Sequence, residues 1–429
     1  MRYKAIKTKL KLSKNDQIFI RWLLHTSKNL YNEALYNVRQ HFFETGTYLT
    51  YEDNYMLLSR KSEHYKILNS TQGQSVIRKV DEAMKAFFGS IKSKKSGKVK
   101  LPRYLEKDGF YSIIDRMVYK PNKEYYILPR GNFIKRISKF YQQASEQLKK
   151  ESIYELNEMT SLGLRIETPK CIQQKQIKEI TIKSKYDGKY MEVIYVYQSE
   201  EELENNNTLT ETMAIDFGYN NLAYCAVTNN NHLHIDGLKL KSMNQRYHKR
   251  ISLLASVRPN QLILTKRMIS LIEKRNNQMI YGINKAAKLI IEHAINNDVG
   301  AIIIGYNEGF KDIKISKKVN QWFKAIPIAR LRDRIVYLAK EVGIESNIIN
   351  EAYTSVASYV DNDDLVATKE KTSFSGNRIQ RGLYKTKHGI LINADLNAAL
   401  NILRKGKPDA LRIGSNGWNT PKRTYLFSS

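Results

Sequence analysis

The stretch of residues 213–228, MAIDFGYNNLAYCAVT, holds two short apolar runs separated by a turn that contains Gly218. Short apolar runs bounded by turn residues predict buried β-strands. The first run leads into Asp216, so we expect a carboxylate at the carboxyl end of a buried strand, where it faces a site instead of bulk solvent. Asp-Phe-Gly is also typical of a turn that only terminates a strand, and the motif alone leaves both interpretations open.

The elements predicted after this stretch follow a characteristic order. They are a third strand, a long helical stretch, a fourth strand, a helix, a fifth strand and a last helix, at residues 232–240, roughly 244–296, 299–306, 321–342, 344–350 and 393–405. Strands that alternate with helices in this way favour a mixed sheet with helices on its faces. Three strands followed by helix, strand, helix, strand and helix is the order of an RNase H-like fold.

The first half of the chain begins with a predicted strand and continues into helices. Residues 1–12 alternate lysine with other residues, which indicates a strand. Ser13, with Asp16 three residues later, is typical of a helix start. Helical spacing then continues to about residue 92.

Beta structure is expected again at residues 110–128 and 176–198. The second of these segments contains two alternating runs on either side of Asp187-Gly188, which predicts a β-hairpin. Residues 134–160, between the two segments, predict a charged helix.

The balance of charges favours a polyanionic partner. Of the 429 residues, 71 are Lys or Arg and 42 are Asp or Glu, which gives a formal net charge of +29. Such an excess favours nucleic acid. The cations are spread along the chain among 28 Tyr, 13 Phe and 3 Trp, whose rings can stack on bases. A basic surface that is only solvated, with rings that only build cores, is the competing interpretation.

The composition excludes several classes of protein. An apolar content of 42% excludes global disorder, and no stretch approaches the roughly 20 apolar residues of a membrane span. The N-terminal residues lack the apolar run of a signal peptide. The two cysteines, Cys171 and Cys225, are too few for a disulfide framework or a four-cysteine zinc site. We therefore expect a protein of the reducing cytosol.

Two further acids are candidates to act with Asp216. Asp395 falls in the first turn of the last predicted helix, where the helix dipole also favours an acid for structural reasons alone. A third carboxylate is expected at the end of the fourth strand, but that strand ends at Gly305. Glu308 lies in the loop beyond it, whereas Glu351 directly follows the neighbouring fifth strand. We prefer Glu351 and keep Glu308 as the alternative.

These acids together predict a metal site. Oxygen-only ligands suit Mg²⁺ or Mn²⁺. Two such ions roughly 3.5–4 Å apart activate water and stabilise the leaving oxygen in phosphodiester hydrolysis. Asp216, Glu351 and Asp395 are therefore expected to bind two ions and to be catalytic.

The segments resemble the RuvC-type nuclease of the transposon-encoded TnpB (OrfB) family, which is related to type V CRISPR effectors. The similarity covers most of the chain, in the stretches AFFGSIKSKKSGKVKLPRY (86–104), MAIDFGYNNLA (213–223), KRNNQMIYGINKAAKLIIEHA (274–294), VGAIIIGYNEGFK (299–311), NEAYTSVASYVDND (350–363) and GNRIQRGLYKTKHGILINADLNAALNI (376–402). The combination is more specific than any single motif. The resemblance implies an RNA-guided, Mg²⁺-dependent DNA endonuclease, encoded by a transposon and associated with the nucleoid in a prokaryotic cytoplasm.

An α+β multidomain architecture is also implied by the resemblance. Its expected parts are a β-barrel-like wedge domain (1–12 and 101–198), a helical recognition domain that interrupts it (13–100), a linker (199–211), an RNase H-like (RuvC) α/β nuclease domain (212–404) and a flexible basic tail (405–429). Many relatives carry two Cys-x-x-Cys pairs just before the last acid. The corresponding residues 354–390 contain no cysteine, so we expect a small metal-free flap and no zinc.

The match by motif gives the acids their roles. Asp216 and Asp395 correspond to the first and the last catalytic acid of the family. The usual second acid lies near Gly305, and this sequence looks like the subgroup in which that acid has moved to Glu351. If it has not moved, the chain is a nuclease-inactive, RNA-guided DNA-binding repressor, which is the alternative. A transposase that joins DNA ends is a third hypothesis, disfavoured because no Tyr-with-His pair stands out.

The expected partners are a guide RNA derived from the transposon end and a target double-stranded DNA. The protein would read a short adjacent duplex motif and the A-form shape of the hybrid. Basic side chains expected at nucleic acid lie in the segment 92–103, in the long helical stretch and in the flap: Lys92, Lys94, Lys95, Lys98, Lys100, Arg103, Lys266, Arg267, Lys274, Arg275, Arg378, Arg381, Lys385 and Lys387. Solvated surface is the competing interpretation for each group.

Overall fold

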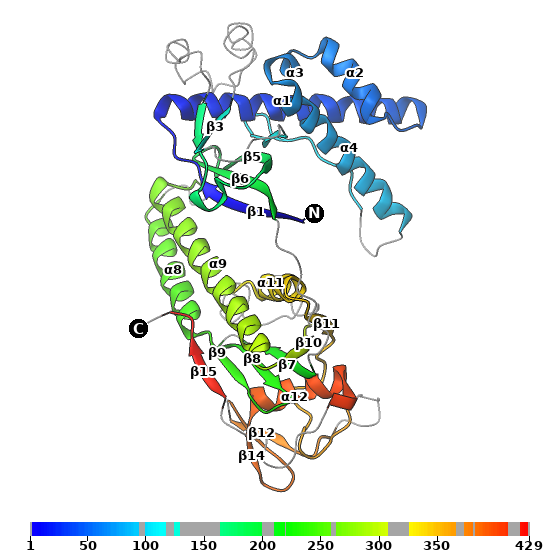
Figure 1. Ribbon diagram of the computed structural model, residues 1–429. Helices are drawn as coiled ribbons and strands as arrows, with labels where there is room; N and C mark the ends of the chain where they lie inside the picture. The colour runs from blue at the N-terminus through cyan, green and yellow to red at the C-terminus, as the bar shows by residue number, and fades with distance from the viewer. Residues whose placement is uncertain are drawn as a thin grey trace. The chain divides into compact units, whose positions relative to one another are not determined.

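The computed structural model describes most of the chain. The described residues are 2–93, 99–116, 124–128, 164–199, 210–218, 220–258, 263–307, 326–365, 373–380, 382–410 and 421–427. The helix predicted at 134–160, together with Lys94, Lys95, Lys98, Glu308 and Arg381, lies outside them. The chain forms two compact units, Met1–Glu201 and Glu202–Ser429, shown in Figure 1 and described separately below. In the described part, no helix is both long enough and apolar enough to cross a membrane.

The first unit contains an antiparallel sheet of strands β1 (Arg2–Lys9), β6 (Tyr190–Ser199), β5 (Ile177–Lys185) and β2 (Ile113–Asp115), in that order. The predicted hairpin at Asp187-Gly188 is confirmed, since β5 and β6 pair on either side of it. Both turn residues have positive φ, 55° and 75°, which Asp tolerates and Gly adopts freely. A second pair, β3 (Tyr125–Leu128) and β4 (Leu164–Glu167), precedes the short 3₁₀ helix η1 (Lys170–Ile172).

Four helices separate β1 from β2 along the chain: α1 (Lys14–Thr45), α2 (Tyr51–Lys61), α3 (Glu63–Ile67) and α4 (Ser70–Lys92). The predicted start at Ser13 is confirmed, because the Ser13 side chain accepts a hydrogen bond from the Asp16 backbone N–H. The apolar faces of α1 and α4 share one core with β5 and β6, in which Trp22 and Tyr195 are fully buried.

The second unit is built on a six-stranded mixed sheet. Its strands, in spatial order, are β11 (Glu345–Ile349), β10 (Val299–Gly305), β7 (Glu211–Phe217), β8 (Asn221–Val227), β9 (Leu233–Asp236) and β15 (Lys422–Tyr425). β10 is parallel to both β7 and β11, whereas β8 is antiparallel to β7 and β9. Strands β7, β10 and β11 therefore end at the same edge of the sheet, and the loop that follows each of them begins there.

Helices cover both faces of this sheet, as Figure 1 shows. The elements are α8 (Leu238–Ser256), α9 (Lys266–Ile295), α11 (Ile328–Glu341) and α12 (Ala394–Gly406), the last followed by the 3₁₀ helix η3 (Pro408–Ala410). Successive side chains of β10 point to opposite faces of the sheet and therefore contact different helices. Ile302 and Ile304 pack with α9 and α11, whereas Ile303 packs with Ile402 and Leu403 of α12.

Two expectations for this unit were wrong. The long helical stretch of 244–296 consists of two helices, α8 and α9, and α8 ends at Ser256, shortly before Pro259 in the sequence. Proline lacks the N–H that a continuing helix needs. The segment 405–429, expected to be a flexible tail, contains β15, which pairs in parallel with β9 and is followed by the buried Leu426.

The residues expected to form a flap, 354–390, contribute two strands of a small three-stranded sheet. Its strands are β12 (Asn377–Gln380), β13 (Leu383–Lys385) and β14 (Leu391–Asn393), and β14 leads directly into α12. The helix predicted at 321–342 begins at Ile328, directly after Pro327, a residue that is favoured at helix starts.

Candidate functional site

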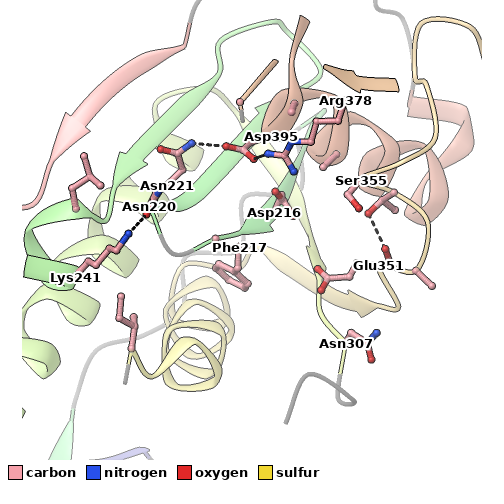
Figure 2. A pocket seen from close by; sticks show the side chains of 18 of the residues that line it. Asp216, Phe217, Asn220, Asn221, Lys241, Asn307, Glu351, Ser355, Arg378 and Asp395 are labelled. Carbon is pink, nitrogen blue, oxygen red and sulfur yellow. Dashed lines mark hydrogen bonds and ion pairs between the residues drawn. The ribbon is translucent and has the colours of Figure 1, made fainter. Parts of the chain in front are cut away.

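Three acids from separate elements line one cavity at the edge of the six-stranded sheet. Asp216 belongs to the end of β7, Glu351 follows β11 by two residues, and Asp395 lies in the first turn of α12. The cavity has a volume of about 840 Å³, and its walls include all three carboxylates. In Figure 2, Asp216 lies between Asp395 and Glu351. The fold thus brings together residues that are up to 179 positions apart, from 216 to 395.

The alternation of β7 explains why Asp216 points into this cavity. Met213 and Ile215 pack in the core with α9 and α11, whereas Ala214 packs against α12 on the other face. Asp216 has the same parity as Ala214, so its side chain projects on the α12 side, toward Asp395. Ala398 and Ala399 of α12 are small and buried, which allows the helix to approach the strand closely.

Gly305 explains how Glu351 reaches the same place. A Cβ atom added at Gly305 would overlap Cδ1 of Ile402 and would lie 3.3 Å from Oε2 of Glu351. The Glu351 carboxylate therefore occupies the space directly beside the strand position where a side chain is missing. Its backbone is fixed by the following turn, because the Glu351 carbonyl accepts hydrogen bonds from the Thr354 N–H and hydroxyl. The preferred acid of the sequence analysis thus lies at the site, and the alternative, Glu308, lies outside the described residues.

Asp395 is held from three directions. Its backbone N–H donates to the side chain of Asn393, which caps α12. Its Oδ2 accepts a hydrogen bond from Nδ2 of Asn221, and its Oδ1 lies 3.7 Å from a guanidinium nitrogen of Arg378. Figure 2 shows Asn221 and Arg378 on either side of this carboxylate. Arg378, expected to contact nucleic acid, therefore also contacts an acid of the site.

The electrostatics of the site favour a bound cation. Burial raises the pKa of Asp216 well above its ordinary value, and the nearby carboxylates of Asp395 and Glu351 raise it further, while Arg378 opposes them. Burial likewise raises the pKa of Glu351. Carboxylates that disfavour one another's ionisation gain most from a divalent cation between them. Among the described residues, however, no three His, Cys, Asp or Glu side chains converge closely enough to ligate a single ion together.

The cavity is also lined by polar and basic side chains. They include Lys241, Gln245 and His248 of α8, together with Asn220 and with Asn307, which lies near Glu351 in Figure 2. Nζ of Lys241 donates to Oδ1 of Asn220 over 2.9 Å. Sequence reasoning did not single out these residues or Asn221. The available signal was the pair of asparagines directly after the turn at Gly218, four and five residues beyond the first acid.

The other predicted nucleic-acid contacts are dispersed. Those on exposed, described positions are Lys92, Lys100, Arg103, Lys266, Arg267, Lys274, Lys385 and Lys387. Arg275 differs from them, because its guanidinium donates to Asn244 over 2.7 Å and lies over the ring of Tyr247. It therefore joins α9 to α8 and is not a freely exposed cation.

Carboxylates connect the segments of the expected flap. The Asp361 carboxylate accepts hydrogen bonds from the Ser358 hydroxyl, over 2.6 Å, and from the Lys387 backbone N–H, over 2.8 Å. The Asp363 carboxylate accepts from the backbone N–H groups of Ser358 and Ser375. Two acids thus join three segments that are distant in sequence.

Comparison with known proteins confirms the resemblance. Residues 194–311 match a family model named OrfB_IS605, described as a probable transposase, and residues 329–402 match the Cas12f1-like TNB domain. The fold is similar to that of Cas12f1 in a complex with sgRNA and target DNA, with a TM-score of 0.53 and 16% identity over 91% of this chain and 83% of that chain. The mini RNA-guided endonuclease CRISPR-Cas_phi3 matches with a TM-score of 0.45 and 9% identity, over 94% and 92% of the two chains. No curated protein matches the chain significantly.

Proposed function

We propose that this TnpB-like protein is an RNA-guided, Mg²⁺-dependent DNA endonuclease whose RuvC-like site hydrolyses phosphodiester bonds. The observation that carries the proposal is the convergence of Asp216, Glu351 and Asp395 on one cavity. The strand order and the helices on both faces of the sheet support an RNase H-like nuclease domain. The charge of +29 and the fold shared with a Cas12f1 complex support nucleic-acid partners.

The donor set of the site fits the proposed metal ions. All three side chains offer oxygen, the donor preferred by Mg²⁺ and Mn²⁺. A two-ion site does not require all three acids on one ion. Asp216, Glu351 and Asp395 would hold the ions between them, and the pKa of Asp216 is raised by both other acids. Bound in this way, the ions supply a water nucleophile and neutralise charge on the scissile phosphate.

The protein's own residues orient the substrate for this chemistry. Lys241 and Arg378 line the same cavity as the acids and provide cations for the phosphates that flank the scissile bond. Asp216 is half-buried, and protein packed around a charge lowers the local dielectric, which strengthens these interactions. Arg378 has to move away from Asp395 for a metal ion to take its place beside the carboxylate, which an exposed side chain does at little cost.

Roles for the rest of the chain follow the same proposal. The sheet of β1, β6, β5 and β2 corresponds to a wedge domain, and the helices α1–α4 correspond to a recognition domain inserted into it. Guide RNA from a transposon end and double-stranded target DNA are the proposed partners. The small sheet of β12, β13 and β14 corresponds to a metal-free flap that presents Lys385 and Lys387 to nucleic acid.

The test begins with the RNA that copurifies with the protein. That RNA is sequenced, and the complex is then assayed for cleavage of a matching DNA with and without Mg²⁺. We expect Mg²⁺-dependent cleavage that falls about 1000-fold or more in Asp216→Asn, with RNA binding retained. Asp333→Asn, at an exposed aspartate of α11, is the control. Cleavage by Asp216→Asn at the wild-type rate refutes the proposal.

A nuclease-inactive, RNA-guided DNA-binding repressor is the second candidate. Gly305 favours it, because the fourth strand carries no acid at its end, and so does Arg378, which occupies one side of Asp395. The same assay separates the two functions. A wild-type complex that binds the matching DNA but leaves it intact at every Mg²⁺ and Mn²⁺ concentration supports the repressor.

A further inference from the structure

Two side chains outside the acidic motifs form a chain of hydrogen bonds that ends on Asp395. Asn221, the first residue of β8, donates from Nδ2 to Asp395 Oδ2. The other end of the same amide, Oδ1, lies 2.7 Å from Nε2 of His234 on the neighbouring strand β9. His234 in turn stacks on the ring of Tyr224, with ring centroids 5.8 Å apart. The chain therefore joins β9, β8 and α12.

The chemistry of the groups fixes the direction of both hydrogen bonds. An ionised carboxylate only accepts, so the amide nitrogen of Asn221 has to face Asp395. The amide oxygen then faces His234 and has to accept, which requires a proton on Nε2 of the imidazole. Burial, together with Arg423, lowers the pKa of His234. A neutral ring with its single proton on Nε2 satisfies this requirement.

Asp395 differs from the other two acids because its carboxylate accepts a side-chain hydrogen bond. Among the hydrogen bonds of the described residues, none is accepted by the side chains of Asp216 or Glu351, whereas Asp395 is held at Oδ2 by Asn221. At Oδ1 the same carboxylate is attracted by Arg378, whose side chain is 46% exposed. Without Asn221, the carboxylate would be free to rotate about its side-chain bonds toward that guanidinium.

We propose that Asn221 and His234 are positioning residues that hold the Asp395 carboxylate in the orientation needed to bind a divalent cation. The inference rests on the proposed function and deepens it. Side chains that orient a ligating group commonly change metal affinity or activity by about 10–100-fold when they are removed. Asn221 acts directly on Asp395, and His234 acts through Asn221 by fixing the orientation of its amide.

The test measures Mn²⁺ binding by the full-length protein, using calorimetry, so that its readout does not depend on cleavage. We expect Asn221→Ala and His234→Leu to weaken Mn²⁺ binding about 10–100-fold. His234→Gln should restore most of the affinity, because the Gln amide nitrogen replaces Nε2 as the donor. Two variants are matched controls. Asn229→Ala removes a hydrogen bond to Asn297 and lies beyond the end of β8 that is far from Asn221, and His293→Gln replaces an imidazole that contacts the Asn231 carbonyl. Neither control should change the affinity.

A purely structural role predicts a different result. In that case the melting temperature of the variants falls while Mn²⁺ affinity stays unchanged, and His234→Gln offers no rescue. If wild type binds Mn²⁺ and both Asn221→Ala and His234→Leu bind it equally well, the positioning role is wrong and the proposed function stands. If wild type binds no Mn²⁺, the proposed metal chemistry fails, and the positioning role fails with it. In the cleavage assay, saturating Mn²⁺ should restore the rate of Asn221→Ala, which loss of a catalytic group would not allow.

Discussion

At the scale of single residues, the site brings together carboxylates that disfavour one another's ionisation. Asp216 faces Asp395 and Glu351, and burial together with this repulsion raises its pKa. A raised pKa in the folded state means that ionisation of Asp216 costs stability. The stability that the protonated carboxyl contributes is fully present below the ordinary value of 3.8 and is lost as the pH rises through the raised pKa of the folded state. At neutral pH, Asp216 therefore lowers the stability of the metal-free protein.

Asp216→Asn is expected to stabilise the metal-free protein. Asparagine removes the charge but keeps the shape, so we expect the melting temperature to rise by about 2–4 °C near pH 7. The gain should shrink below pH 4, where Asp216 of the wild type is protonated, and it should shrink again when Mg²⁺ is added to the wild type. Thermal melting across pH measures both effects. A melting temperature of Asp216→Asn that equals or falls below that of wild type at neutral pH contradicts the description of the site.

Gly305→Ala is expected to destabilise the protein by about 1–3 kcal/mol, because the added methyl overlaps Ile402 Cδ1. Ile402→Val removes that atom, so the loss in the double variant should be smaller than the sum of the single losses. Denaturant unfolding of the four proteins measures the coupling. Strictly additive losses would show that position 305 has room for a side chain, and the close approach of α12 to β10 would then be wrong.

At the scale of elements, alternation along buried strands accounts for most of the site. The apolar runs around Ile215 and Ile303 predicted β7 and β10. The place of Glu351 directly after the predicted fifth strand predicted its side chain at the edge where these strands end, and Glu351 lines the cavity there. The break between α8 and α9 and the strand β15 were missed. β15 has the sequence Lys-Arg-Thr-Tyr, which carries no apolar signal, and only pairing with β9 makes it a strand. Asn221 was missed because its role depends on a contact with residue 395.

Leu426→Ala tests whether the C-terminal segment belongs to the fold. Leu426 is only 2% exposed and packs in the core with α9, so truncation should cost about 2–5 kcal/mol. Tyr425, next to it, is 60% exposed, and Tyr425→Ala is the matched control with an expected effect below about 1 kcal/mol. Denaturant unfolding provides the comparison. Equal, small losses for both variants would restore the interpretation of residues 405–429 as a flexible tail.

At the scale of the whole molecule, the net charge and the candidate site both favour nucleic acid as the partner. A net charge of +29 attracts polyanions whatever their sequence, so in the proposed function the choice of a target falls to base pairing with a guide RNA. The sequence predicted this class of partner from composition, since charge does not depend on the fold. It could not predict that Arg378, one of the expected contacts, lies against Asp395, because that ion pair depends on how β12 packs beside α12.

In the proposed site, Glu351 replaces the acid that β10 lacks at Gly305. The most direct measurement is Mg²⁺-dependent cleavage of matching DNA by the protein–RNA complex, with Glu351→Gln compared with Glu345→Gln, a control on the exposed strand β11 of the same sheet. We predict that Glu351→Gln abolishes cleavage while RNA and DNA binding persist, and that Glu345→Gln cleaves like wild type. Full-rate cleavage by Glu351→Gln would show that Glu351 does not replace that acid.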